Sequence, residues 1–159
     1  MITNHKTFVC KLNEENFDKS QYLYHGTTDA VLDDIMKNGL KNPYLTDLYE
    51  KAVYYSIEAS EDSGGEPVVL KIKTLNKNLL RVDFNELNEP VVVGSMIDSK
   101  KTFKNIQKEY KKYIKTHPDT YDKKYDTILV RPEDYFVSLN TVHSVSYNGT
   151  IKPEFIDIM

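Results

Sequence analysis

The chain has 159 residues, of which 40% are hydrophobic and 28% are charged, and this composition predicts one globular domain over residues 1–159. The formal net charge of −3 shows that the chain as a whole is neither strongly basic nor strongly acidic, and the single cysteine, Cys10, excludes an internal disulfide and a thiolate metal cluster. No apolar run approaches the roughly 18 residues that a membrane span requires, and the N-terminus lacks the apolar core of a secretion signal, so we expect a cytoplasmic protein without membrane contact.

A strand, a turn and a helix are predicted over residues 22–40. Residues 22–24 are strand formers, and apolar residues at helical spacing then continue to Gly39, a residue type typical of helix C-termini. Between them, Gly26 allows the backbone to turn and to approach another group closely. His25 either meets a ligand at the end of this strand or only caps the turn, and its spacing does not decide between the two.

A second helix is predicted after the segment Tyr44-Leu45-Thr46-Asp47, because apolar residues recur at helical spacing from residue 48 to residue 59. A glycine-containing loop over 63–67 leads into a strand over 67–73, and a short extended piece follows over 79–84. The sequence pattern of residues 85–98 does not decide their secondary structure.

An amphipathic helix is predicted over residues 99–117, with aromatic and aliphatic residues on one face and lysines around the rest. Residues 99–124 hold nine lysines against three acidic residues, so this segment has a net charge of +6. Such a basic surface is a candidate contact for nucleic acid or for an acidic partner. The alternative is an ordinary solvated helix face.

The C-terminal part of the chain is predicted to contain mainly strands. A buried strand over 125–130 leads into a polar turn over 131–134, and strands over 135–137 and 142–147 follow. Helices early in the chain and strands late in it indicate an α+β fold with antiparallel pairing.

Three segments in this order resemble the ADP-ribosyltransferase fold of the diphtheria-toxin and poly(ADP-ribose) polymerase type. They are Tyr24-His25-Gly26-Thr27, then residues 44–47 with the helix carrying residues 52–56, and finally residues 125–137. The resemblance covers about residues 20–146. It implies split antiparallel β-sheets around an NAD cleft, flanking helices and a His-Tyr-Glu triad.

The resemblance also implies roles for residues of the first two segments. His25 matches the triad histidine, which in the family hydrogen-bonds the adenosine-side ribose of NAD. Gly26 matches the glycine whose backbone holds the nicotinamide amide, and Thr27 belongs to the same NAD-binding segment. Tyr44 matches the triad tyrosine, which lies against the nicotinamide ring.

For two further roles the resemblance leaves two candidate residues each. The second nicotinamide-stacking tyrosine of the family corresponds to Tyr54 or to its neighbour Tyr55. The triad carboxylate corresponds to Glu133 or Asp134, which precede the predicted strand over 135–137. Because side chains alternate faces along a strand, we expect only one of the two acids to point into the cleft.

The function implied is an NAD-dependent mono-ADP-ribosyltransferase that transfers ADP-ribose to a macromolecular acceptor, protein or nucleic acid, and releases nicotinamide. No metal is needed, and the four histidines show no ligand spacing. Together with the small size, the resemblance suggests a bacterial or phage effector or toxin. One alternative is a non-catalytic module that binds NAD or ADP-ribose on the same fold. A less favoured alternative is an RNA 2′-phosphotransferase, because the chain has only two arginines, Arg81 and Arg131.

Overall fold

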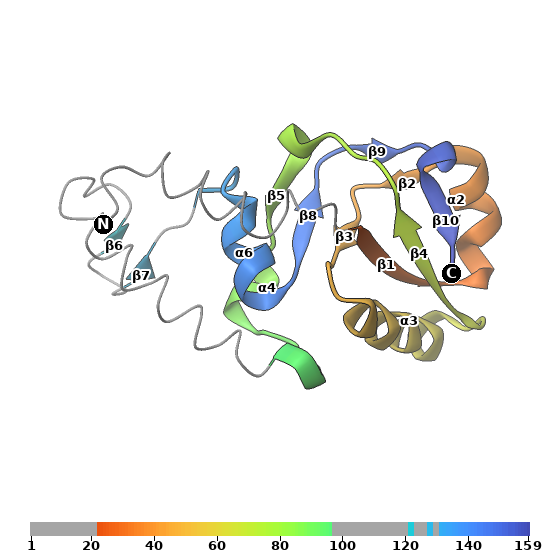
Figure 1. The fold of residues 1–159 in the computed structure, drawn as a ribbon. Helices are drawn as coiled ribbons and strands as arrows, with labels where there is room; N and C mark the ends of the chain where they lie inside the picture. The colour runs from red at the N-terminus through yellow and green to blue at the C-terminus, as the bar shows by residue number, and fades with distance from the viewer. Residues whose placement is uncertain (1–21, 97–120, 123–126, 129–130) are drawn as a thin grey trace.

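The computed structural model describes residues 22–96, 121–122, 127–128 and 131–159, and its fold is α+β (Figure 1). All strand pairs in the described part are antiparallel, which confirms the predicted fold class at this level. The basic helix predicted over 99–117 lies outside the described residues.

The first sheet has the strand order β1-β4-β10. It consists of β1 (Leu23–Thr28), β4 (Pro67–Ile72) and β10 (Ile156–Ile158). Helix α3 (Tyr49–Ser63) packs on β1 and β4, while the 3₁₀ turn η1 (Asp29–Val31) and helix α2 (Leu32–Asn38) follow β1 (Figure 1). The turn predicted at residues 25–27 is therefore wrong, because β1 continues through these residues and its full length pairs with β4.

The second sheet has the strand order β3-β8-β5. Its strands are β3 (Tyr44–Leu45), β8 (Val145–Tyr147) and β5 (Leu80–Val82). Helices α4 (Phe84–Asn88) and α6 (Tyr135–Val142) lie beside it. The strand predicted over 135–137 is wrong, because these residues begin α6. Nearly every residue of α6 is buried, and a helix buried on all sides shows no amphipathic period that distinguishes it from a buried strand.

The remaining elements are short. Strand β2 (Leu40–Lys41) pairs with β9 (Thr150–Ile151), and β6 (Tyr121–Asp122) pairs with β7 (Thr127–Ile128). Single 3₁₀ turns form at η2 (Lys77–Leu79), η3 (Gly94–Met96) and η5 (Pro153–Phe155). No helix in the described part of the chain is both long and apolar enough to cross a membrane.

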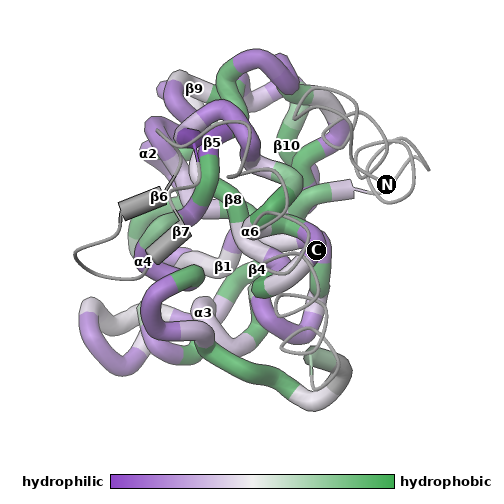
Figure 2. The backbone as a smooth tube through the Cα atoms, turned by 90° about the vertical axis from the view of Figure 1, so that its left-hand side faces the viewer, coloured by the Kyte–Doolittle hydropathy of each residue, from purple (hydrophilic) through white to green (hydrophobic). Residues whose placement is uncertain are grey.

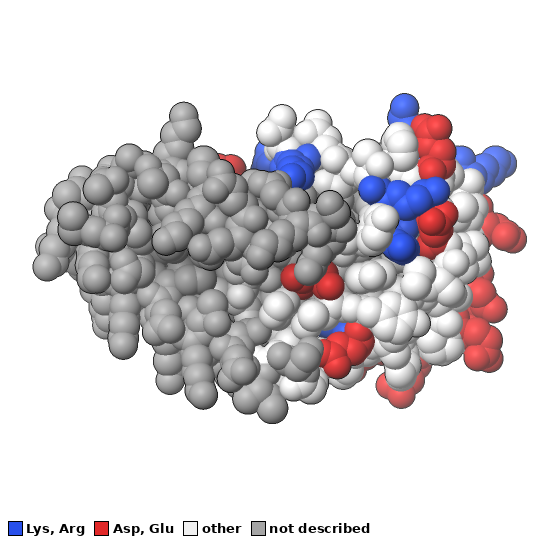
Figure 3. Space-filling view, in the orientation of Figure 1, with Lys and Arg blue, Asp and Glu red and all other residues white. Residues whose placement is uncertain are grey.

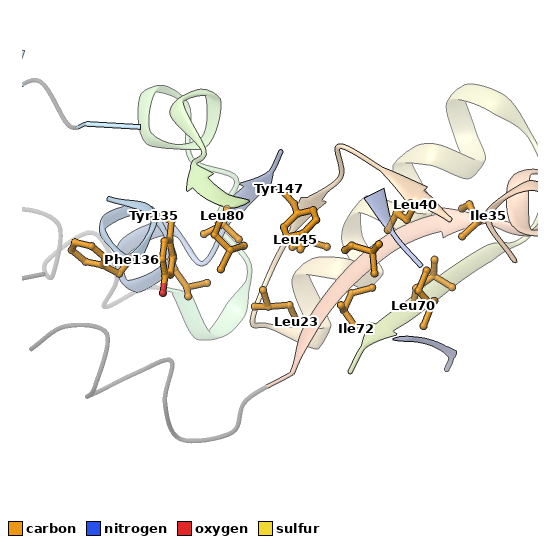
Figure 4. Packing of buried hydrophobic residues seen from close by; sticks show 14 of the residues in the cluster. Leu23, Ile35, Leu40, Leu45, Leu70, Ile72, Leu80, Tyr135, Phe136 and Tyr147 are labelled. Atoms are coloured by element: carbon orange, nitrogen blue, oxygen red, sulfur yellow. The ribbon is translucent and has the colours of Figure 1, made fainter. Parts of the chain in front are cut away.

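One hydrophobic core joins the two sheets. Figure 4 shows it extending from Tyr135 and Phe136 of α6, through Leu45 of β3, to Leu70 of β4 and Ile35 of α2. In Figure 2 hydrophobic stretches run through the middle of the molecule, and hydrophilic ones such as α2 lie at its edge. Both sheets therefore pack on the same core, which fixes their relative position.

Candidate functional site

The two sheets meet at one β-bridge and separate immediately beyond it. Tyr24 donates its backbone N–H to the Thr46 carbonyl at 2.7 Å, and Thr46 donates to the Tyr24 carbonyl at 3.0 Å. Hydrogen-bonded pairs in an antiparallel ladder recur every second residue, so the next pair would be Gly26 with Tyr44. Instead, the Tyr44 carbonyl oxygen accepts from His25 Nδ1 at 2.8 Å. The imidazole therefore lies where the ladder would continue, and the strands part around it.

This hydrogen bond determines the tautomer of His25. A carbonyl oxygen can only accept, so Nδ1 carries the proton and Nε2 carries the lone pair. Burial lowers the pKa of His25, and the hydrogen bond to the Tyr44 carbonyl only partly opposes that shift. The ring is therefore neutral at pH 7. Nε2, which has no partner among the described residues, can accept a hydrogen bond from a ligand hydroxyl.

A cavity of about 410 Å³ opens where the sheets separate. Four of the residues singled out from the sequence line it, namely His25, Gly26, Tyr44 and Tyr55. Thr27, Tyr54, Glu133 and Asp134 are not among its lining residues. The lining residues that the sequence analysis did not select are Tyr24, Leu45, Thr46, Glu58, Ala59, Asp62, Asp83, Asn85, Glu86 and Ser144.

Gly26 is required by the close packing of α3 on β1. A Cβ added at this position would lie 2.2 Å from the Ala52 carbonyl oxygen and 2.6 Å from the Ser56 nitrogen, both in the backbone of α3. Neither atom can move without displacing the helix. The expected close approach at Gly26 is therefore confirmed, and the group that approaches is helix backbone.

Three tyrosines, Tyr24, Tyr44 and Tyr55, supply aromatic surface to the cavity. Tyr44 is 54% exposed, and its hydroxyl accepts from Asn85 Nδ2 at 3.3 Å. The hydroxyl of Tyr54 instead donates to Glu58 at 2.9 Å on the exposed side of α3, a hydrogen bond that raises the pKa of Tyr54. Of the two alternatives for the stacking tyrosine, Tyr55 is the one on the cavity.

The two acids predicted to complete the triad lie elsewhere. Asp134 is buried and bonds to Arg131, with Nε 3.1 Å from its Oδ2. The side chain of Glu133 is 59% exposed and lies 3.7 Å from the same guanidinium. The expectation that one acid points into the cleft assumed a strand after residue 134. Because a helix begins there instead, strand alternation does not apply to these side chains.

Other carboxylates line the cavity. Asp83 forms the N-cap of α4, accepting from the Glu86 N–H at 3.1 Å with Oδ1 and from the Ser144 hydroxyl at 2.5 Å with Oδ2. Glu86 follows in the first turn, and Glu58 and Asp62 come from α3. An Asp followed three residues later by Glu, directly after a strand, is close to the capping-box signature. That signal could have located α4 and both of its acids.

In Figure 3 acidic side chains appear near the middle of the face shown and along its right-hand edge. The cavity lining includes four acids and, among the described residues, no lysine or arginine. Aromatic rings combined with carboxylates suit a flat, positively charged group, because both the ring faces and the acids attract cations. No cluster of metal-ligating side chains occurs in the described part of the chain.

The chain has no match among family models, curated proteins or solved structures.

Proposed function

We propose that this cavity binds the nicotinamide end of NAD and that the protein is an NAD-dependent mono-ADP-ribosyltransferase with an ADP-ribosyltransferase-like fold. One observation carries the proposal. His25 and Tyr44, the two residues that the family resemblance selects as triad members, are joined by a hydrogen bond at the edge of one cavity. Gly26 and Tyr55, selected in the same way, line that cavity too.

The chemistry of the lining supports NAD as the substrate. Oxidised NAD carries its positive charge on the pyridinium ring, which the tyrosines and carboxylates of the cavity would attract. The neutral His25 has a free acceptor at Nε2 for a ribose hydroxyl. The described lining offers no cation for the diphosphate, so we expect that part of NAD to lie outside the cavity.

The reaction breaks the bond between the ribose and the nicotinamide nitrogen, and the bonding electron pair leaves with nicotinamide. Positive charge develops on the ribose, where a nearby carboxylate stabilises it. An oxygen or nitrogen of the acceptor, or water, then bonds to the ribose carbon and releases its proton. The acceptor would be a protein or nucleic acid, and the basic segment 99–117 is a candidate contact for it.

The test is release of nicotinamide from NAD by the purified protein, alone and with cell lysate. We expect His25→Ala and Tyr44→Ala to abolish release, because they remove the ribose acceptor and the stacking ring. Tyr54→Ala is the matched control for an exposed tyrosine off the cavity and should cost much less than Tyr55→Ala. Unchanged release in both the His25 and the Tyr44 variant, with native circular dichroism, would contradict the proposal.

The acceptor class can be read from the same lysate. With NAD labelled in the ADP-ribose part, label that protease removes identifies a protein acceptor, and label that nuclease removes identifies a nucleic acid. A non-catalytic NAD-binding module remains the second candidate, because both acids predicted to be catalytic lie off the cavity. Saturable NAD binding without nicotinamide release, with or without lysate, would favour that module.

A further inference from the structure

Glu86 is a buried carboxylate with one oxygen unused by the protein. Its side chain is 8% exposed. Oε2 accepts from Lys51 Nζ at 2.7 Å and from the Val91 N–H at 3.1 Å. Oε1 has no hydrogen-bond partner among the described residues. A buried acceptor left without a partner is costly, so this oxygen is suited to a donor that the cavity receives from outside.

Lys51, a residue of α3, holds this carboxylate in place by a direct buried contact. Its side chain is fully buried, and its ammonium donates to Glu86 and, at 2.6 Å, to the Val142 carbonyl of α6. Lys51 does not line the cavity, so its positive charge neutralises the Glu86 carboxylate from within the protein interior. The carboxylate of Glu86 is thus held in a fixed position at the cavity, which a site that stabilises developing charge requires.

The other cavity acids are less suited to this role. Both oxygens of Asp83 already accept hydrogen bonds from Glu86 and Ser144. Glu58 and Asp62 are exposed on α3, where solvent screens their charge. Glu58 also accepts from the Tyr54 hydroxyl. Glu86 alone among the four combines burial, a fixed position and an unused oxygen.

We propose that Glu86 is the catalytic carboxylate of this cavity, with Oε1 accepting a hydrogen bond from a ribose hydroxyl of NAD and stabilising the positive charge that develops on that ribose. Lys51 is its positioning residue. This inference rests on the proposed function. It assigns to α4 the role that the sequence resemblance placed at Glu133 or Asp134.

The experiment compares Glu86→Gln with Glu133→Gln and with Glu89→Gln, the matched control on an exposed residue just after α4. In Glu86→Gln the amide oxygen can still accept from Lys51, while the NH₂ group replaces the unused acceptor Oε1. We expect the Kd of NAD to rise about tenfold, since a hydrogen bond to a charged group is lost. Nicotinamide release at saturating NAD should fall a further ~100-fold. Glu89→Gln should match the wild type.

The outcomes separate this inference from the proposed function. Release lost in Glu133→Gln but retained in Glu86→Gln would overturn the inference and leave the proposed function standing. If wild-type protein binds NAD without turnover, the test is the Kd of NAD for Glu86→Gln. A Kd equal to that of the wild type overturns the inference. Wild-type protein that neither binds nor cleaves NAD would overturn the proposed function itself. Should Glu86→Gln lose its fold by circular dichroism, the double variant Lys51→Met/Glu86→Gln, which removes both buried charges, takes its place.

Discussion

The two sides of the cavity are held together by different forces. On the side of β1 and α3, backbone packs directly on backbone, and Gly26 leaves no space for even one added carbon. On the side of α4 and α6, buried polar side chains determine the arrangement, with Asp83 bonded to Ser144 and Glu86 to Lys51. Lys51 belongs to α3, so its ion pair with Glu86 also ties the two sides to each other. Added side-chain bulk should therefore destabilise the side of β1 and α3. Loss of a charged partner should destabilise the side of α4 and α6.

The largest effect is expected from breaking the ion pair between the two sides. Lys51→Met leaves the buried carboxylate of Glu86 without its counter-ion, which typically costs about 3–5 kcal/mol of unfolding free energy. Urea unfolding followed by circular dichroism measures this loss. Lys73→Met is the matched control, because its pair with Asp157 is exposed and should contribute less than about 1 kcal/mol. Equal losses in the two lysine variants would show that the buried pair does not hold the two sides together.

A smaller loss is expected from filling the contact between β1 and α3. Gly26→Ala forces the added Cβ against the Ala52 carbonyl and the Ser56 nitrogen, and such overpacking typically costs about 1–3 kcal/mol. Gly94→Ala is the control, because the nearest atom to its added Cβ lies at an ordinary 3.7 Å. The urea midpoints of both variants provide the comparison. A Gly26→Ala protein as stable as the wild type would mean that α3 can shift away from the sheet.

The smallest expected effect is on the pH dependence of stability, and it tests the burial of the His25 imidazole between the strands. Burial places the folded-state pKa of His25 below its ordinary value near 6.5, so in the window below 6.5 the unfolded chain binds the proton more readily. The contribution of His25 to the free energy of unfolding is therefore complete above pH 6.5 and is lost as pH falls towards the folded-state pKa. Unfolding midpoints at pH 7.5 and 5.5 should fall less in His25→Gln than in the wild type. The same acid sensitivity in both proteins would place the titrating group elsewhere.

Local sequence patterns were sufficient to predict the elements on the β1 and α3 side of the cavity. The helical spacing after Tyr44 predicted α3, the β-branched run predicted β4, and the segment from Tyr24 to Thr27 led to His25 and Gly26. These signals depend on residues close together in the chain. The Asp83 to Glu86 spacing was a similar local signal for α4, and the residue types of 85–98 by themselves did not reveal it.

The amino-acid sequence alone determined the α+β class, the helix α3, the strand β4 and the selection of His25 and Gly26, because each follows from periodicity or from a short motif. Tyr44 was selected through the family resemblance. Only the tertiary structure decided that 135–137 is helical, that Glu133 and Asp134 lie off the cavity, and that Glu86 lines it. Burial on all sides removes the period of α6, and the pairing of Lys51 with Glu86 joins residues 35 positions apart. Long-range contacts of that kind have no counterpart in the spacing of neighbouring residues.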